Sequence, residues 1–229
     1  MRAYGELELT QASPPQTFVE PISLAEAKAY LRADQSPADP ADDDLISGLI
    51  TAARAAAEIR QNKDLVVKQQ DLHLDLLIGY DAIAGAAYPL RMNNVYNFGV
   101  GYEIELRYPL NSVELFTHTN SDGSVVELVN PDDYRLDTHR AYVLPPLGKT
   151  WPWFSPDVTS AVLIRFTSGY TKDHPFWQNE GRLVMTGMKY LISQWYYSRL
   201  MIEPGRISSQ DIPNWIEAML SAGFRPRVH

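Results

Sequence analysis

The sequence predicts an α+β protein in which a four-helix bundle is interrupted by an antiparallel β insertion. Apolar residues recur at helical spacing before residue 64 and again after Pro175. From Leu65 onward, between these two regions, apolar and polar residues alternate as they do in half-buried strands. Because the two ends of an inserted segment are usually neighbours, the helices are expected to pack together as one domain. The expected parts are an N-terminal arm with two helices (1–64), the β insertion (65–170), and two C-terminal helices with a tail (171–229).

The first helix is predicted to begin after Pro21-Ile22-Ser23. Ser23 is the expected N-cap, and Glu26, three residues later, completes a capping box. The helical pattern of "LAEAKAYLRA" ends before Pro37 and Pro40.

A second helix is predicted to begin at "ADDD". Asp42, Asp43 and Asp44 fall in its first turn, where carboxylates complement the helix dipole. A metal site is the alternative, but the surrounding sequence does not supply the further ligands that it needs. The expected apolar face contains Leu45, Ile46, Leu49, Ile50, Ala53, Ala56 and Ala57. The opposite face is expected to carry Ser47, Thr51, Arg54 and Glu58.

The β insertion is predicted to begin with a strand in which Leu72, Leu74 and Leu76 alternate with polar residues. His73 lies on the polar face and is expected to be a solvated strand residue rather than a metal ligand. Residues 79–102 show no clear period and are predicted to form a long loop or an irregular hairpin. Further strands are predicted at Glu103–Arg107, Val113–Thr119, Val125–Val129, Ala141–Leu144 and Ala161–Thr167, with a hairpin turn at Asn120-Ser121-Asp122-Gly123.

Helical spacing returns after Pro175 and predicts a helix from Phe176 to Ile202. Its apolar face is expected to contain Leu183, Val184, Met188, Leu191, Ile192 and Trp195. Pro204 and Gly205 end this helix. A short last helix is predicted over Ile212–Leu220, followed by the basic tail "GFRPRVH".

The composition is that of a soluble globular protein, with 45% apolar and 21% charged residues. The absence of Cys excludes disulfides, thiolate metal sites and cysteine nucleophiles. The first residues lack the apolar core of a signal peptide, and no apolar run reaches the roughly 18 residues that span a bilayer. A soluble protein made in the cytosol is expected, with no membrane partner.

The formal charge of −8 is concentrated near the N-terminus. Residues 1–44 contain nine Asp or Glu against three Arg or Lys, which leaves a local charge of −6. Because phosphate neutralisation supplies most non-specific DNA affinity, such a chain is poorly suited to gripping DNA. It could still lie beside DNA without holding it.

No catalytic constellation is found. Gly148-Lys149-Thr150 ends like a nucleotide-binding P-loop, but Val143 replaces the required first glycine, and Pro145 and Pro146 have no N–H for phosphate. The five histidines show no metal-ligand spacing, and no G-x-S-x-G elbow is present. Asp132-Asp133 is interpreted as part of an ordinary turn, Pro131–Tyr134, that leads into a strand, rather than as an acid–base pair. The sequence therefore predicts no enzyme activity, no metal and no cofactor.

The loop around Trp151, Trp153 and Phe154 is rich in aromatic residues. With Tyr142 these rings could stack on a sugar, so a carbohydrate-binding or glycan-processing β domain is one hypothesis. The alternative is that they cover the open end of the β block or pack at a subunit interface, where Trp and Tyr are enriched.

The ordered set of segments resembles the head-tail connector (adaptor) proteins of tailed bacteriophages, in the branch with a β insertion. "EPISLAEAKAYLRAD" and "DDDLISGLITAARAAAEIRQNKDLV" resemble the opening helices of that family. "LNSVELFTHTNSDGSVVELVNPDDYRLDTHR", "GKTWPW" and "AVLIRFTSGY" resemble its β insertion, and "LISQWYYSRLMI" with "DIPNWIEAMLSAGFRPRV" its closing helices. The resemblance extends from about Pro21 to the end. It does not include the first 20 residues or 79–102, and "WYYSRL" stands where a more acidic string is typical.

The resemblance implies a structural virion protein of the neck, assembled in the host cytoplasm. Such proteins form a ring, twelvefold in this family, beneath the portal protein. The ring extends the channel through which the genome is ejected and provides the attachment surface for a stopper or tail completion protein. DNA is then expected to pass without specific binding.

Three sets of residues are assigned expected roles in such a ring. Asp42, Asp43 and Asp44 are expected to face the channel. Phe224, Arg225, Arg227 and Val228 are expected to dock on the portal, because the tail is basic and too short to build its own core. Trp151, Trp153 and Phe154 are the expected interface aromatics.

Overall fold

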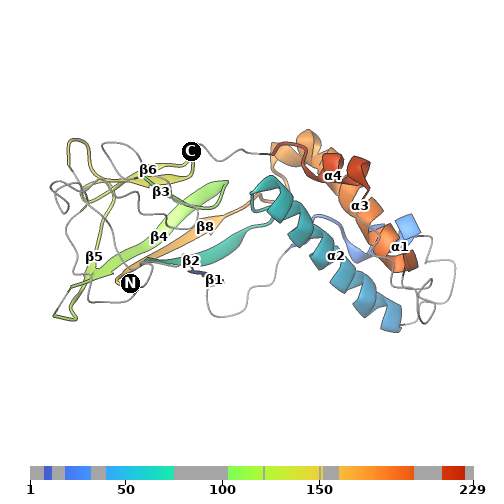
Figure 1. Ribbon diagram of the computed structural model, residues 1–229, viewed down its shortest axis with the longest axis horizontal. Coiled ribbons are helices and arrows are strands. Elements are labelled where there is room, and N and C mark those ends of the chain that lie inside the picture. The colour runs from blue at the N-terminus through green and yellow to red at the C-terminus, as the bar shows by residue number, and fades with distance from the viewer. Residues whose placement is uncertain are drawn as a thin grey trace. The chain divides into compact units, whose positions relative to one another are not determined.

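The computed structural model describes residues 8–11, 19–31, 40–74, 103–120, 122–149, 151, 160–198 and 213–224 (Figure 1). The chain forms two compact units, and each is described by itself. One unit is helical and takes its described residues from Phe18–Val66 and Tyr170–Pro226. The other is a β unit made of Val67–Gly169 and strand β1 (Glu8–Gln11). The predicted α+β class, a helix bundle with a β insertion, is confirmed.

The helical unit contains α1 (Leu24–Leu31), α2 (Pro40–Gln61), a 3₁₀ turn η3 (Pro175–Gln178), α3 (Glu180–Ser198) and α4 (Asn214–Leu220). The capping box at the start of α1 is confirmed, because Ser23 Oγ accepts the Glu26 N–H at 3.2 Å and the Ser23 N–H donates to Glu26 Oε2 at 3.0 Å. Helices α2 and α3 pack against each other, and both contact α1 and α4. The core between them includes Ile46, Ile50, Val184, Met188 and Leu191.

The predicted helix from Phe176 is wrong in its first turn. Residues Pro175–Gln178 form η3, and Asn179 (φ −114°, ψ −109°) separates this turn from α3. Gly181 explains the tight junction, because a Cβ there would come within 2.8 Å of the Phe176 carbonyl oxygen. The buried face of α3 also differs from the prediction, since Leu183 is exposed while Gly187 and Tyr196 are buried. Residues 199–202 lie outside the described residues.

The solvent face predicted for α2 is also corrected. Arg54 and Glu58 are 4% and 5% exposed, although the spacing placed them on the outer face. They are buried because Arg54 donates to Glu20 and Glu58, and Glu58 also accepts the Leu65 N–H.

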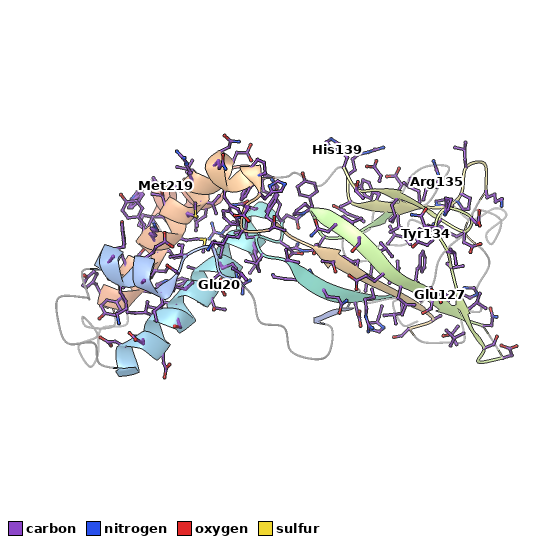
Figure 2. The ribbon with its side chains drawn as sticks, turned by 180° about the vertical axis from the view of Figure 1, so that it is seen from behind. Glu20, Glu127, Tyr134, Arg135, His139 and Met219 are labelled. Carbon is purple, nitrogen blue, oxygen red and sulfur yellow. The ribbon has the colours of Figure 1, made fainter. Side chains whose placement is uncertain are left out.

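The β unit contains two antiparallel sheets. The larger has the strand order β1-β2-β8-β4-β5 and the smaller the order β3-β7-β6. The remaining strands are β2 (Lys68–Leu74), β3 (Ile104–Glu105), β4 (Leu110–Thr119), β5 (Val125–Glu127), β6 (Arg135–Asp137), β7 (Tyr142–Leu144) and β8 (Val162–Ser168). Both sheets contribute to one apolar core, which includes Leu72, Phe116 and Ile164 from the larger sheet and Ile104 and Val143 from the smaller. Tyr134, labelled in Figure 2, precedes β6 and packs its ring 5.2 Å from that of Phe116.

Strand β1 was not predicted, and β6 is the strand expected after the turn at Asp132-Asp133. Strand β1 pairs antiparallel with β2, so part of the N-terminal arm belongs to the larger sheet. Strand β6 pairs with β7 over three residues. The predicted hairpin at residues 120–123 is confirmed, because β4 pairs with β5 and the Asn120 N–H donates to the Ser124 carbonyl at 2.8 Å. Residues 75–102, which include the predicted excursion and Leu76, lie outside the described residues.

Candidate interaction surfaces

The three acidic residues at the start of α2 have different surroundings. Asp42 accepts a hydrogen bond from the Tyr196 hydroxyl at 2.9 Å, which ties the start of α2 to the end of α3. Asp43 accepts from Lys28 Nζ of α1 at 2.6 Å. Asp44 is exposed. Two of the three carboxylates therefore hold neighbouring helices, and Asp44 is the one best placed to act on something outside the subunit.

The aromatic loop is described only at Trp151. Its indole is 2% exposed and packs 5.7 Å from the ring of Phe116 in the core of the β unit. A ring buried in its own subunit offers little surface to a sugar or to a neighbouring subunit. Trp153 and Phe154 lie outside the described residues.

The P-loop-like triplet follows a tight turn. The Lys149 N–H donates to the Pro146 carbonyl at 3.0 Å, and Gly148 has a φ of +75°, which favours glycine. Lys149 is exposed, and Thr150 lies outside the described residues. This backbone N–H is turned into its own loop rather than toward a phosphate.

Each of the described histidines lies in a different environment. His73 is half-buried on β2, and His118 is buried on β4 with Nε2 3.1 Å from Asn120 Oδ1. His174 Nδ1 accepts the Phe176 N–H at 3.1 Å and caps η3. His139 is exposed. Within the described ranges no three His, Asp or Glu side chains are grouped so that they could hold a metal ion; His229 lies outside them.

The carboxylates near residue 132 are used in turns. Asp133 Oδ2 accepts the Val129 N–H at 2.9 Å, and Asp137 accepts from the backbone and the guanidinium of Arg140. These bonds from Arg140 lower the pKa of Asp137, and the backbone bond has the largest effect. Asp132 is exposed beside them. The turn predicted here is confirmed.

A buried ionic cluster in the helical unit was missed by the sequence prediction. Arg54 donates to Glu20 at 2.8 Å and to Glu58 at 2.9 Å. Glu58 in turn accepts the Leu65 N–H at 3.0 Å, and Figure 2 shows Glu20 beside α2. The cluster joins the chain before α1, the middle of α2 and the chain after α2. The i,i+4 spacing of Arg54 and Glu58 signals a pair, but nothing in the local sequence places that pair inside.

The outer face of the larger sheet carries a second polar cluster. Arg165 on β8 donates two hydrogen bonds of 2.8 Å to Asp71 on β2. These bonds lower the pKa of Asp71, against the opposing effect of its burial. Glu114 on β4 accepts from the Gln69 amide and the Thr167 hydroxyl. The contacts depend on strand register, which the sequence alone does not specify.

Three aromatic side chains form a row on the outside of the helical unit. The ring of Tyr190 on α3 lies 6.0 Å from that of Tyr30 on α1 and 4.7 Å from that of Trp215 on α4, both edge to face. Tyr30, Tyr190 and Trp215 are 40%, 37% and 50% exposed. This aromatic row had no counterpart in the sequence prediction, because its members come from three separate helices.

The predicted docking segment is described only at its start. Phe224 is 53% exposed, and its N–H donates to the Ser221 carbonyl at 2.9 Å. Arg225, Arg227 and Val228 lie outside the described residues. Phe224 is therefore exposed after α4, and the docking of this segment stays a prediction.

No protein-family model matches the sequence, and no curated protein matches it in sequence. Among the described residues, no helix is both long and apolar enough to cross a membrane.

Solved structures of gene transfer agent (GTA) particles contain chains with a similar fold. One is from the neck of an empty GTA particle computed with C6 symmetry, with a TM-score of 0.62 and 19% identity over 97% of both chains. Another is from the virion of a native GTA particle, with a TM-score of 0.62 and 18% identity over 96% of this chain and 97% of that one. A third, from the neck of a native GTA particle computed with C12 symmetry, has a TM-score of 0.57 and 18% identity over 97% of both chains. Over 96–97% of its length the chain is thus similar in fold to chains of these particles.

Proposed function

We propose that this protein is a structural component of the neck of a phage-like particle, a head-tail connector. The observation that carries the proposal is the likeness to neck chains over 97% of both chains, which spans the helical unit and the β unit together. The similar necks were computed with C6 and C12 symmetry, which supports a ring of identical subunits. A twelvefold ring is the form proposed for this chain.

In this role the ring lies beneath the portal protein and extends the DNA channel. A stopper or tail completion protein attaches to its other side, and the genome passes through during ejection. The acidic balance of the chain suits a channel wall, because DNA phosphates find few cations to bind. Asp44 is proposed to face this channel, and the segment from Phe224 to Val228 is proposed to dock on the portal.

The proposed role requires no chemistry from the chain. Several of the described carboxylates and histidines are engaged structurally: His174 caps η3, Asp133 stabilises a turn and Glu58 is in an ion pair. The glycan-binding hypothesis loses support, because Trp151 lies in the core of the β unit. If the glycan-binding hypothesis were right, the purified chain would be a monomer that binds oligosaccharide.

The test is the assembly state with and without the portal protein. The purified chain is measured by light scattering and negative-stain imaging, alone and mixed with the portal of the same particle. A ring of twelve subunits on the portal is the expected result. If the chain stays monomeric when mixed with excess portal at the highest protein concentration tested, the proposal is contradicted.

A further inference from the structure

The outward face of α2 has an unusual composition for a surface helix. Surface helices normally present charged side chains to water and apolar ones to the core. From Ser47 to Ile59 every exposed residue is uncharged: Ser47, Gly48, Thr51, Ala52, Ala55 and Ile59. Ile59 is 78% exposed, while the charged Arg54 and Glu58 of the same turns are buried. This uncharged α2 face has the composition of a surface that is covered in an assembly.

The aromatic row, Tyr30, Tyr190 and Trp215, resembles a binding surface in its residue types and in the fixed arrangement of its rings. Tyr and Trp are enriched among the residues that dominate binding energies at protein interfaces. The interplanar angles of 87° and 86° show that each ring is held by the edge or face of the next. Rings fixed in this way lose little conformational freedom on binding, which favours association.

The two surfaces cannot meet within one subunit. The buried residues of α2, such as Ile46 and Ile50, face the bundle, and so do Val184 and Met188 of α3. The helices pack side by side (Figure 1), and the residues of both surfaces stay exposed, so neither surface covers the other. Tyr190 of α3 is 37% exposed, and Ile59 of the uncharged α2 face is 78% exposed.

We propose that the aromatic row of one subunit docks on the uncharged α2 face of the next subunit. The proposal rests on the ring proposed above and names its contact surfaces. Gly48, Ala52 and Ala55 allow bulky rings to approach the helix backbone, and Ile59 adds an apolar contact. The exposed α2 residues carry no charge themselves, and the Glu20 carboxylate that accepts from Thr51 at 3.1 Å is already paired with Arg54. Because the two surfaces differ, the contact is head to tail, and its repetition gives a ring when the rotation between subunits closes.

Cysteine cross-linking tests the contact directly, because the chain contains no Cys of its own. Ala55→Cys marks the uncharged α2 face, and Ala218→Cys marks the exposed side of α4 one turn after Trp215. The double variant, assembled on the portal and oxidised mildly, is expected to give a ladder of disulfide-linked oligomers. A mixture of the two single variants should stop at dimers, and each single variant alone should remain uncross-linked.

Substitutions that change the two surfaces provide a second measurement. Trp215→Ala and Ala55→Arg should each raise the protein concentration needed for ring formation at least tenfold. Light scattering measures that concentration. Ala25→Arg is the matched control, because Ala25 is exposed on α1 but lies on a different side from Tyr30, and it should assemble as the wild type does. Circular dichroism melts establish that each variant folds before assembly is scored.

The outcomes separate this proposal from the function on which it rests. Rings that form on the portal without cross-links in the double variant overturn the contact and leave the proposed function standing. Dimers from Ala218→Cys alone also overturn it, because the aromatic row would then pack on itself. A wild-type chain that never forms a ring overturns the proposed function, and the contact with it.

Discussion

At the scale of single residues, Arg54 is the side chain whose environment differs most from its expected one. Its guanidinium lies between Glu20 and Glu58, and Glu58 also accepts the Leu65 N–H. The two carboxylates and the guanidinium share a largely buried site. Each charged group has lost much of its hydration, and the opposite charges beside it compensate for that loss. Removing only this cation takes away the guanidinium that pairs with both Glu20 and Glu58.

Arg54→Ala is therefore expected to lower the free energy of unfolding by about 3–5 kcal/mol, the cost of breaking one side of a buried ion pair. Arg60→Ala is the matched control on the same helix. Arg60 pairs with Glu217, and both side chains are 37% exposed, so its loss should cost only about 0–1 kcal/mol. Urea denaturation of both variants measures the difference. Equal losses would mean that the buried cluster contributes no more than a surface pair.

Asp71 provides a pH-dependent prediction on the β unit. The hydrogen bonds from Arg165 hold the folded-state pKa of Asp71 below its ordinary value of 3.8. A group with a lowered folded pKa contributes stability above the unfolded pKa, and this contribution is lost as the pH falls through the folded pKa. At pH 7 the wild type should exceed Asp71→Asn by about 1 kcal/mol in unfolding free energy.

The same comparison is then repeated at lower pH. The difference between wild type and Asp71→Asn should stay constant down to about pH 5 and shrink as the pH falls below the ordinary aspartate pKa. Urea titrations from pH 7 to pH 2.5 follow it. A difference that does not change with pH would show that Asp71 acts through its shape rather than through its charge.

At the scale of secondary-structure elements, the contact of α3 with α4 depends on Gly187. A Cβ at this position would lie 3.0 Å from the Met219 Cβ and 3.3 Å from the Leu220 backbone nitrogen. The short helix α4, seven residues long, therefore packs directly on the backbone of α3. The absence of a side chain at Gly187 allows this close approach, which also places Trp215 beside Tyr190.

Gly187→Ala and Gly48→Ala form a matched pair of helix substitutions. Alanine is a better helix former than glycine, so Gly48→Ala, with no atom within 4 Å of the new Cβ, should stabilise the subunit by about 0.5–1 kcal/mol. Gly187→Ala should instead destabilise it by about 1–3 kcal/mol, because the added methyl overpacks the contact with α4. Thermal and urea unfolding of the dilute subunit compare them. If both variants are stabilised, α4 can move away from the added methyl group without lowering the free energy of unfolding.

At the scale of the whole molecule, the proposed ring requires surfaces beyond those that fold the subunit. Four exposed features of the described residues are assigned to this role: Asp44, the aromatic row, the uncharged α2 face and Phe224. The proposed assignments are the channel for Asp44, the neighbouring subunits for the two helical surfaces, and the portal for Phe224 and the residues after it.

Deleting residues 225–229 is expected to weaken portal binding roughly tenfold or more, which corresponds to about 1.4 kcal/mol or more. The described contacts of α4 and Phe224 remain, so the thermal unfolding of the subunit should be unchanged. A variant with Arg225→Lys and Arg227→Lys keeps the charge and should bind nearly as the wild type does. Binding is measured with immobilised portal. Undiminished affinity of the truncated chain would remove the docking assignment.

The sequence by itself determined the elements whose signals are local. The capping box at Ser23, the start of α2 near Asp42 and the hairpin at residues 120–123 each follow from a few neighbouring residues. The α+β class follows from the change of hydrophobic period along the chain. These features are predictable because propensity, capping and turn chemistry act within a few residues.

Only the tertiary structure decided the features that depend on distant residues. Arg54 is buried because Glu20, 34 positions earlier, supplies a partner, and Trp151 is buried because Phe116 lies beneath it. Strand β1 exists because β2 offers an edge, and the aromatic row joins residues 30, 190 and 215. Hydrophobic periodicity predicts burial from the polarity of each residue alone. Actual burial also depends on the partner that the fold places beside the residue. These partners are distant in the sequence, so local patterns do not predict them.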